Sequence, residues 1–180
     1  MNKKEAIIDL SISFVKQYSF QELSFSYLAE QLSITKAAIH YYFKSKTDLG
    51  VAICETIGAH FQEQQAYFEA HPEQSAYLLI EQRLGFLAED EICPVVSLQA
   101  DVNKYDATLQ AKVRELAQID YETYARVLAR HLSFTQAQEL AQVHLASIKG
   151  ARIYNRTLGI PFEQTVLTKV QQEIREVEHR

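Results

Sequence analysis

The side chains best suited to chemistry lie between residues 24 and 46, where hydrogen-bond donors alternate with small residues. Lysine, histidine and tyrosine can donate to phosphate oxygens and base edges, and alanine can approach a thymine methyl group. Lys36 could contact either a guanine edge or a phosphate, and Tyr42 could instead face the core beside Phe43. The residues expected to contact nucleic acid are Ser24, Ser26, Thr35, Lys36, Ala37, Ala38, His40, Tyr41, Tyr42 and Lys46.

These side chains need helices to position them, and the segment 24–49 carries the signals for three. Ser24, Thr35 and Ser45 are of the type that caps a helix N-terminus. A cap at Ser45 would place the Lys46 ammonium at the positive end of the third helix, where a phosphate is the natural partner. Leu and Ile residues on either side of the turn at Ser33 can pack together. The pattern predicts a helix-turn-helix, whose second helix enters the DNA major groove.

This segment resembles the DNA-binding part of the TetR family of transcriptional regulators. The resemblance covers roughly the first fifty residues, and its most specific part is the run from Tyr41 to Leu49. Ser19 and Ser33 stand where the family usually has glycine, and the usual tyrosine-then-histidine order appears swapped at His40 and Tyr42. A serine can adopt the left-handed backbone of the turn at a modest cost. The resemblance implies an N-terminal DNA-binding domain followed by a helical effector and dimerisation domain.

The rest of the chain also predicts helices. Glycine and proline are scarce, at 5 and 3 of 180 residues, and no alternating β-branched run is bounded by turn signals. We expect an all-α protein of about nine helices. The expected domains are a helix-turn-helix domain over 1–47 and a ligand-binding and dimerisation domain over 48–180. One helix of the second domain is expected over 73–90, and a short one is expected to begin near Pro94.

Charge is distributed unevenly along the chain. The net charge is −5, yet residues 1–50 contain six lysines against five carboxylates, a balance of +1, so the remainder carries −6. An acidic whole chain therefore does not exclude DNA binding by a small N-terminal domain. The weak local positive charge predicts modest non-specific affinity, so two copies joined on two half-sites would be needed.

The last two helices, over about 135–178, could form an association surface. The final one has a nearly continuous apolar stripe, namely Phe162, Val166, Val170, Ile174 and Val177. The preceding one has small residues around Gly150, and a glycine inside a helix usually has a packing reason. Periodicity alone leaves open whether these helices bind a second copy or only complete an intramolecular core. The resemblance implies a homodimer through them.

Polar residues on otherwise apolar stripes are the candidates for a ligand pocket. Asp120 lies between Leu116 and Tyr124, and Arg83 lies between Ile80 and Leu87. A buried ion pair of Arg83 with Asp120 is the simpler interpretation, because an ionised side chain in the core needs a partner. Cys93 lies in a segment that, by resemblance, lines the effector domain near its pocket, but a buried structural cysteine is the simpler interpretation. The candidate set is His60, Phe61, Arg83, Phe86, Cys93, Asp120 and Tyr124.

Several classes of function lack support in the sequence. No nucleophile elbow, phosphate-binding glycine loop or paired histidines are found, so we expect no enzyme, no cofactor and no metal site. No signal segment or apolar tract of about 18 residues is found, which predicts a cytoplasmic protein with reduced cysteines and no membrane partner. The expected function is a dimeric transcriptional regulator, most simply a repressor that a small-molecule effector releases from a palindromic operator. The alternative is a regulator whose C-terminal domain binds a protein partner.

Overall fold

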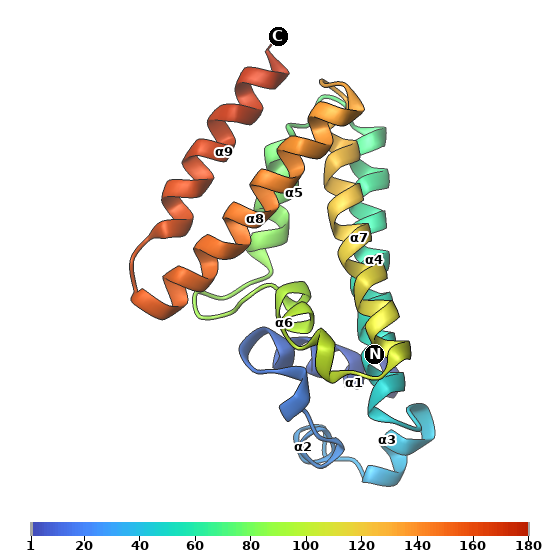
Figure 1. The fold of residues 1–180 in the computed structure, drawn as a ribbon. Helices are drawn as coiled ribbons and strands as arrows, with labels where there is room; N and C mark the ends of the chain where they lie inside the picture. The colour runs from blue at the N-terminus through green and yellow to red at the C-terminus, as the bar shows by residue number, and fades with distance from the viewer. Residues whose placement is uncertain (1, 180) are drawn as a thin grey trace. The chain divides into compact units, whose positions relative to one another are not determined.

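The computed structural model describes residues 2–179 and shows an all-helical chain (Figure 1). Over these residues nine α-helices and two short 3-10 helices are present and no strand is found, as the sequence predicts. The elements are α1 (Lys3–Gln17), η1 (Phe20–Glu22), α2 (Phe25–Gln31), α3 (Lys36–Tyr42), α4 (Lys46–Ala70), α5 (Ala76–Gly85), α6 (Pro94–Ala100), η2 (Val102–Lys104), α7 (Ala107–Leu128), α8 (Phe134–Leu158) and α9 (Phe162–Glu178). None of the helices described is long and apolar enough to cross a membrane.

The chain is divided into two compact units, and the helices α4 and α7 contribute residues to both. The first unit contains the residues up to Ala59 together with Cys93–Ala117, that is α1 to α3, the start of α4, α6, η2 and the start of α7. Its core includes Ile7, Val15, Phe20, Leu49 and Leu98, all at most 1% exposed.

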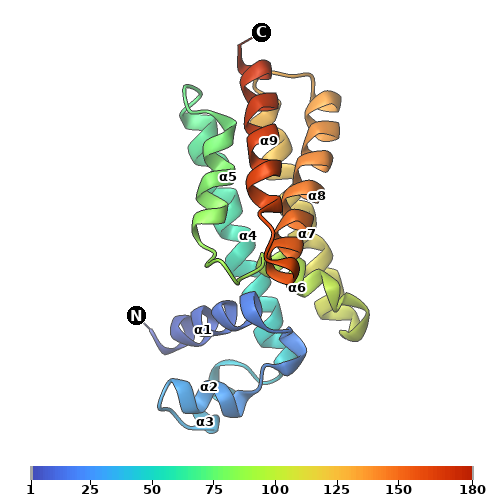
Figure 2. The ribbon, with the colours of Figure 1, turned by 90° about the vertical axis from the view of Figure 1, so that its left-hand side faces the viewer.

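The second unit contains His60–Ile92 and the chain from Gln118 onward. Figure 2 shows α8 and α9 running side by side, joined by a turn at Gly159 with a left-handed φ of 66°. Phe68, Leu79, Val127, Ala137 and Ile174 are fully buried in its core. The stripe on α9 predicted for association is therefore largely internal, because Val170 and Ile174 pack against this core. Whether the last two helices also bind a second copy stays a prediction, since Phe162 at the start of the stripe is exposed.

Local sequence signals set most helix starts, and tertiary contacts set some ends. The hydroxyls of Ser24, Thr35 and Ser45 accept from the backbone N–H of Tyr27, Ala38 and Asp48 at 3.1 Å in each case. These three caps were predicted. The helix expected over 73–90 is shorter than predicted: α5 spans only Ala76–Gly85. The chain after it is held as a loop by contacts to a distant helix, described below.

Candidate nucleic-acid interface and effector region

The helix-turn-helix is built around a small buried contact. Leu28 on α2 and Ile39 on α3 are both fully buried. Between them, Ser33 has a φ of 52°, and its N–H donates to the Glu30 carbonyl at 3.1 Å. The N–H of the next residue, Ile34, donates to the Ala29 carbonyl at 3.0 Å. The left-handed serine expected from the sequence is therefore present, and it fixes the direction in which α3 leaves α2.

The predicted contact residues lie mainly on the outer face of α3. Lys36, Ala37, His40 and Tyr41 are exposed, and Tyr41 reaches 71%. The remaining predicted residues near this face are exposed (Ser24, Ser26, Thr35) or half-buried (Ala38, Tyr42). The His40 ring packs edge-on against Phe25, with centroids 4.9 Å apart, so α2 orients it. This face can donate hydrogen bonds and offers alanine methyls for apolar contact.

Lys46 has a contact that the sequence did not suggest. Its ammonium donates to the Gln21 carbonyl at 2.6 Å and lies 5.1 Å from the centroid of the Phe20 ring. Partial burial lowers the pKa of Lys46. Asp48 already occupies the first turn of α4, where its carboxylate accepts from the Ser45 N–H at 2.9 Å. Lys46 thus links the start of α4 to the segment before α2, in addition to its predicted phosphate contact.

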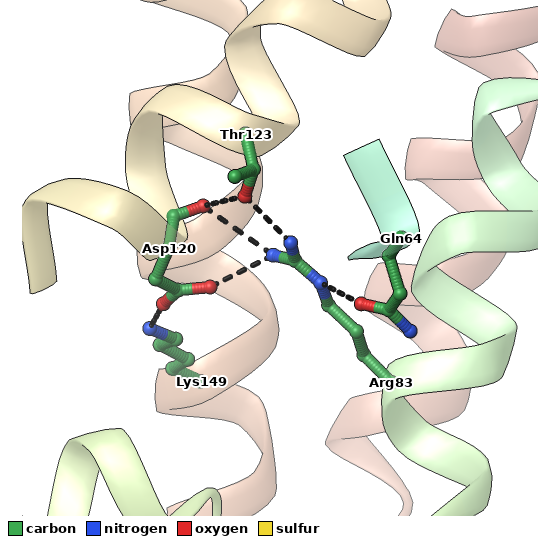
Figure 3. A network of polar contacts seen from close by, with 5 residues as sticks. All are labelled: Gln64, Arg83, Asp120, Thr123 and Lys149. Atoms are coloured by element: carbon green, nitrogen blue, oxygen red, sulfur yellow. Dashed lines mark hydrogen bonds and ion pairs between the residues drawn. The ribbon is translucent and has the colours of Figure 1, made fainter. Parts of the chain in front are cut away.

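In the second unit, the Arg83 side chain is the centre of a buried polar network (Figure 3). Its Nη1 atom donates to Asp120 Oδ1 at 2.8 Å, Nη2 donates to the Thr123 hydroxyl at 2.7 Å, and Nε donates to Gln64 at 3.1 Å. Lys149 from α8 contacts the other carboxylate oxygen of Asp120. The Asp120 side chain is only 4% exposed. The ion pair of Arg83 with Asp120 predicted from the sequence is confirmed, and Lys149 joins it.

The other candidate ligand residues are not all brought together. The buried Phe61 ring lies under the Arg83 guanidinium, with 4.2 Å from its central carbon to the ring centroid. His60 and Phe86 contact each other edge-on at the surface, with centroids 5.2 Å apart. Cys93 belongs to the first unit, whereas the other candidates belong to the second.

Tyr124, the last candidate, contacts His144, a buried residue that the sequence reasoning missed. Its hydroxyl contacts His144 Nδ1 at 2.7 Å, and His144 Nε2 contacts Glu173 on α9 at 2.8 Å. His144 is 1% exposed. It lies between Ala141 and Ile148 at helical spacing, the same signal that singled out Asp120. A neutral imidazole fits both contacts, since Tyr124 can donate to Nδ1 and Nε2–H can donate to the carboxylate.

A dependence of stability on pH follows from this burial. Desolvation lowers the pKa of His144 below its ordinary value, against a smaller opposing effect of Glu173. The unfolded chain then binds the proton more tightly, so the free energy of unfolding should decrease as pH falls below about 6.5. Urea denaturation from pH 7.5 to 5 measures this decrease. His144→Gln should flatten it and the exposed His131→Gln should not; equal slopes in both variants would contradict the assignment.

Arg152 is a second buried residue that sequence reasoning did not single out. Its Nη1 contacts both carboxylate oxygens of Glu163 at 2.8 Å, and its Nε donates to the Glu91 carbonyl at 2.8 Å. Its other terminal nitrogen donates to the Ala88 carbonyl. These bonds hold the loop after α5 against α8 and the start of α9, which explains why that loop does not continue the predicted helix. No local sequence pattern could reveal these contacts, because the two partners lie more than 60 residues apart in the sequence.

Comparison with known proteins agrees with this geometry. Residues 7–53 match the family model of bacterial regulatory proteins of the tetR family. A TetR transcriptional regulator from Legionella pneumophila has a similar fold with a TM-score of 0.85 at 20% identity, covering 96% of this chain and 97% of that one. A TetR family regulator from Agrobacterium tumefaciens gives 0.78 at 16% identity, covering 95% and 96%. The reduced form of E. coli NemR gives 0.77 at 18%, covering 95% and 96%. No curated protein is matched by sequence.

The matched segment contains the complete helix-turn-helix, including the buried pair Leu28 and Ile39 and the exposed face of α3. The similar structures show that the fold extends over nearly the whole chain. The segment 7–53 therefore matches the tetR family of bacterial regulatory proteins, and the whole chain has the fold of the TetR regulators with which it was compared.

Proposed function

We propose that the protein is a homodimeric repressor that binds a palindromic operator and is released by a small-molecule effector. The observation that carries the proposal is the outer face of α3, where Lys36, His40 and Tyr41 are exposed above a buried helix contact. Two such helices would enter successive major grooves about 34 Å apart. DNA binding is assigned to residues 1–47, through the ten residues predicted above, and effector binding and dimerisation to 48–180.

Operator binding can be tested with the DNA that flanks the gene of this protein. We expect fluorescence anisotropy to detect sequence-selective binding that weakens as salt rises, because phosphate contacts release counterions. A scrambled duplex of the same composition is the control. Equal affinity for both duplexes, or no binding at low salt, would refute the proposal.

Lys36 is the long cationic side chain on the outer face of α3. If it contacts a guanine edge, Lys36→Ala should relax discrimination at one base pair by about 1–3 kcal/mol; if it contacts a phosphate, all sequences should weaken alike. Anisotropy titrations on a set of single-base operator variants separate the two. Arg126→Ala removes the same charge from an exposed position on α7 and should leave all affinities unchanged. No effect of Lys36→Ala would remove this residue from the interface.

Dimerisation through the last two helices, over about 135–178, is supported by one face of α8. Val143, Tyr154 and Leu158 on this helix are each more than half exposed, although they are large and apolar. A Cβ atom added to Gly150 would meet nothing within 4 Å. A helical glycine without a neighbour costs stability within a single chain, so a second helix approaching closely there explains its presence.

Gly150→Glu should therefore disrupt the dimer by placing a charge in a closely packed interface. Operator affinity should fall by about 100-fold or more, since the two half-sites would no longer be joined. Sedimentation velocity measures the first effect and anisotropy the second. Gly85→Glu is the matched control, because Gly85 also lies in a helix and also has nothing within 4 Å. A monomeric wild-type chain, or a Gly150→Glu chain that stays dimeric, would contradict the proposed interface.

The proposed effector would bind among the helices of the second unit, where the Arg83 network lies beside the Phe61 ring. Because the polar atoms there already contact one another, a ligand would have to rearrange them and so favour another conformation. Helix α4 contributes to both units and could transmit this change, so effector and operator binding must be reciprocally coupled. A compound at 100 times its dissociation constant should add about 2.7 kcal/mol of stability in a thermal-shift screen. The same compound must weaken operator binding. A compound that binds the protein and strengthens operator binding would refute the proposal that the effector releases the repressor from its operator.

A protein partner is the second candidate, favoured by two neighbouring clefts along α9, the larger bordered by α8 and the loop after α5 and the smaller by α5. Their volumes are about 500 and 320 Å³, and Tyr77 and Gln171 line both. Under this alternative, Gln171→Arg would abolish a partner's effect on operator binding and leave the affinity for the operator itself unchanged. Under the effector proposal, the same variant would leave the response to the compound intact.

A further inference from the structure

In the first unit, residues 97–109 hold the segment of chain that enters the helix-turn-helix. The Ser97 hydroxyl donates to the Tyr18 carbonyl at 3.3 Å. The Tyr105 ring packs edge-on against Phe20, with centroids 5.7 Å apart. Side chains from a distant part of the sequence therefore fix the backbone just before α2.

The same stretch also contacts the segment that leaves the helix-turn-helix. Thr47, in the first turn of α4, contacts the Asp106 carboxylate. Gly50 lies one turn later, and a Cβ atom added to it would be 2.8 Å from Leu109 and 2.9 Å from Phe20. The entry and exit segments therefore meet each other and the start of α7. Because α2 and α3 pack together as one pair, the positions of its two ends set the direction in which α3 is presented.

Asp101 brings a charged acceptor to the entry segment. The residue is 8% exposed, and its carboxylate accepts from the Ser19 hydroxyl through one oxygen and from the Lys104 ammonium, at 2.6 Å, through the other. The hydrogen bonds from Lys104 and Ser19 hold the pKa of Asp101 below its ordinary value, so the side chain is charged at neutral pH. A hydrogen bond to a charged acceptor is stronger than one between neutral groups. Ser19 is therefore held more firmly than a neutral acceptor would hold it.

We propose that Asp101 is a positioning residue for operator binding, which holds the entry to α2 through its hydrogen bond to Ser19. This inference rests on the proposed function, in which the exposed face of α3 binds DNA. A negative charge in the unit that would bind DNA repels phosphates, so charge alone makes Asp101 unfavourable there. The bond to Ser19 and the charge of Asp101 therefore act on operator affinity in opposite directions.

Two substitutions of Asp101 separate the bond from the charge. Asp101→Ala loses both, and the full-length chain should bind the duplex from the DNA that flanks its gene about tenfold more weakly, since fewer molecules present α3 correctly. Asp101→Asn removes the charge but keeps an oxygen acceptor for Ser19, so its affinity should equal or exceed that of the wild type. Ser19→Ala is a milder change that should weaken binding as Asp101→Ala does, and the double variant should bind no more weakly than either single one. Anisotropy titrations measure these affinities at a temperature where circular dichroism shows every variant folded.

Glu115→Ala is the control, because it removes an exposed negative charge from the same unit and should not weaken binding. Hydrogen exchange without DNA tests the hold on α2 separately: Asp101→Ala and Ser19→Ala should speed exchange of the amides in 18–32 by about twofold to tenfold and leave 137–151 unchanged. A wild-type chain that binds a scrambled duplex equally well would refute the proposed function, while the exchange rates would still decide whether Asp101 holds this segment. Wild-type affinity in Asp101→Ala and Ser19→Ala, an equal loss in Asp101→Asn, or unchanged exchange would overturn the positioning role.

Discussion

Replacing Asp120 with alanine is expected to destabilise the protein by about 3–5 kcal/mol, because it removes a buried carboxylate that two cations contact. The side chains of Arg83 and Lys149 are 13% and 21% exposed, so water cannot readily compensate either charge. Such a loss is a large fraction of the stability of a typical domain. Urea denaturation should give a lower midpoint with an unchanged slope.

Glu115→Ala is the control on the same helix. Glu115 contacts Lys112 at 2.9 Å, but its side chain is 56% exposed, so the expected loss is only about 0–1 kcal/mol. Replacing all three charged residues, Arg83→Met, Asp120→Leu and Lys149→Met, should recover much of the stability lost in Asp120→Ala. If Asp120→Ala costs no more than Glu115→Ala, the network does not contribute as a buried charge cluster.

Substituting valine for Gly50 is expected to cost about 3 kcal/mol, at the upper end of the range for overpacked cores. A Cβ atom on Gly50 would lie 2.8 Å from both terminal carbons of Leu109 and 2.9 Å from the tip of the Phe20 ring. Both neighbours are buried, so neither can move away without disturbing the core of the first unit. Thermal or urea denaturation of the purified variant measures the loss.

Two further variants test whether the cost comes from the close contact. Gly85→Val adds the same side chain to a helical glycine with open space around it, so it should change stability by less than about 1 kcal/mol. Adding Leu109→Ala to Gly50→Val should restore stability relative to Leu109→Ala alone, since the new side chain fills the space that the leucine leaves. A similar cost for both glycine substitutions would show that helix propensity and not packing determines the loss.

The sequence predicts features that depend on short-range chemistry. Ser24, Thr35 and Ser45 were recognised as caps because a hydroxyl beside the first turn satisfies a backbone N–H in almost any context. Ser33 was expected to be left-handed because it stands where the family that the segment resembles usually has glycine, and a serine can adopt that conformation at a modest cost. Arg83 and Asp120 could be paired because each interrupts an apolar helical stripe, which leaves a buried charge in need of a partner.

Distant contacts whose partners carry no local signal in the sequence were not predicted. The loop after α5 is held by Arg152, more than 60 residues away, and Lys46 contacts a carbonyl 25 residues before it. The stripe on α9 has the same periodicity whether it faces its own core or a second chain, and only the fold shows that Val170 and Ile174 are internal. The fold places the predicted contact residues Lys36, Ala37, His40 and Tyr41 on an exposed face of α3, and their roles in binding DNA stay predictions.

The division of α3 into a buried and an exposed face has a consequence for how operator preference could evolve. Leu28 and Ile39 are fully buried where α2 and α3 pack together, whereas Lys36, Ala37 and His40 are exposed. Under the proposed DNA contacts, substitutions at the exposed positions would change which bases are contacted with little effect on folding, since surface changes usually alter stability by less than about 0.5 kcal/mol. A duplicated copy of the gene could diverge toward a new operator one exposed residue at a time, and every intermediate would still fold.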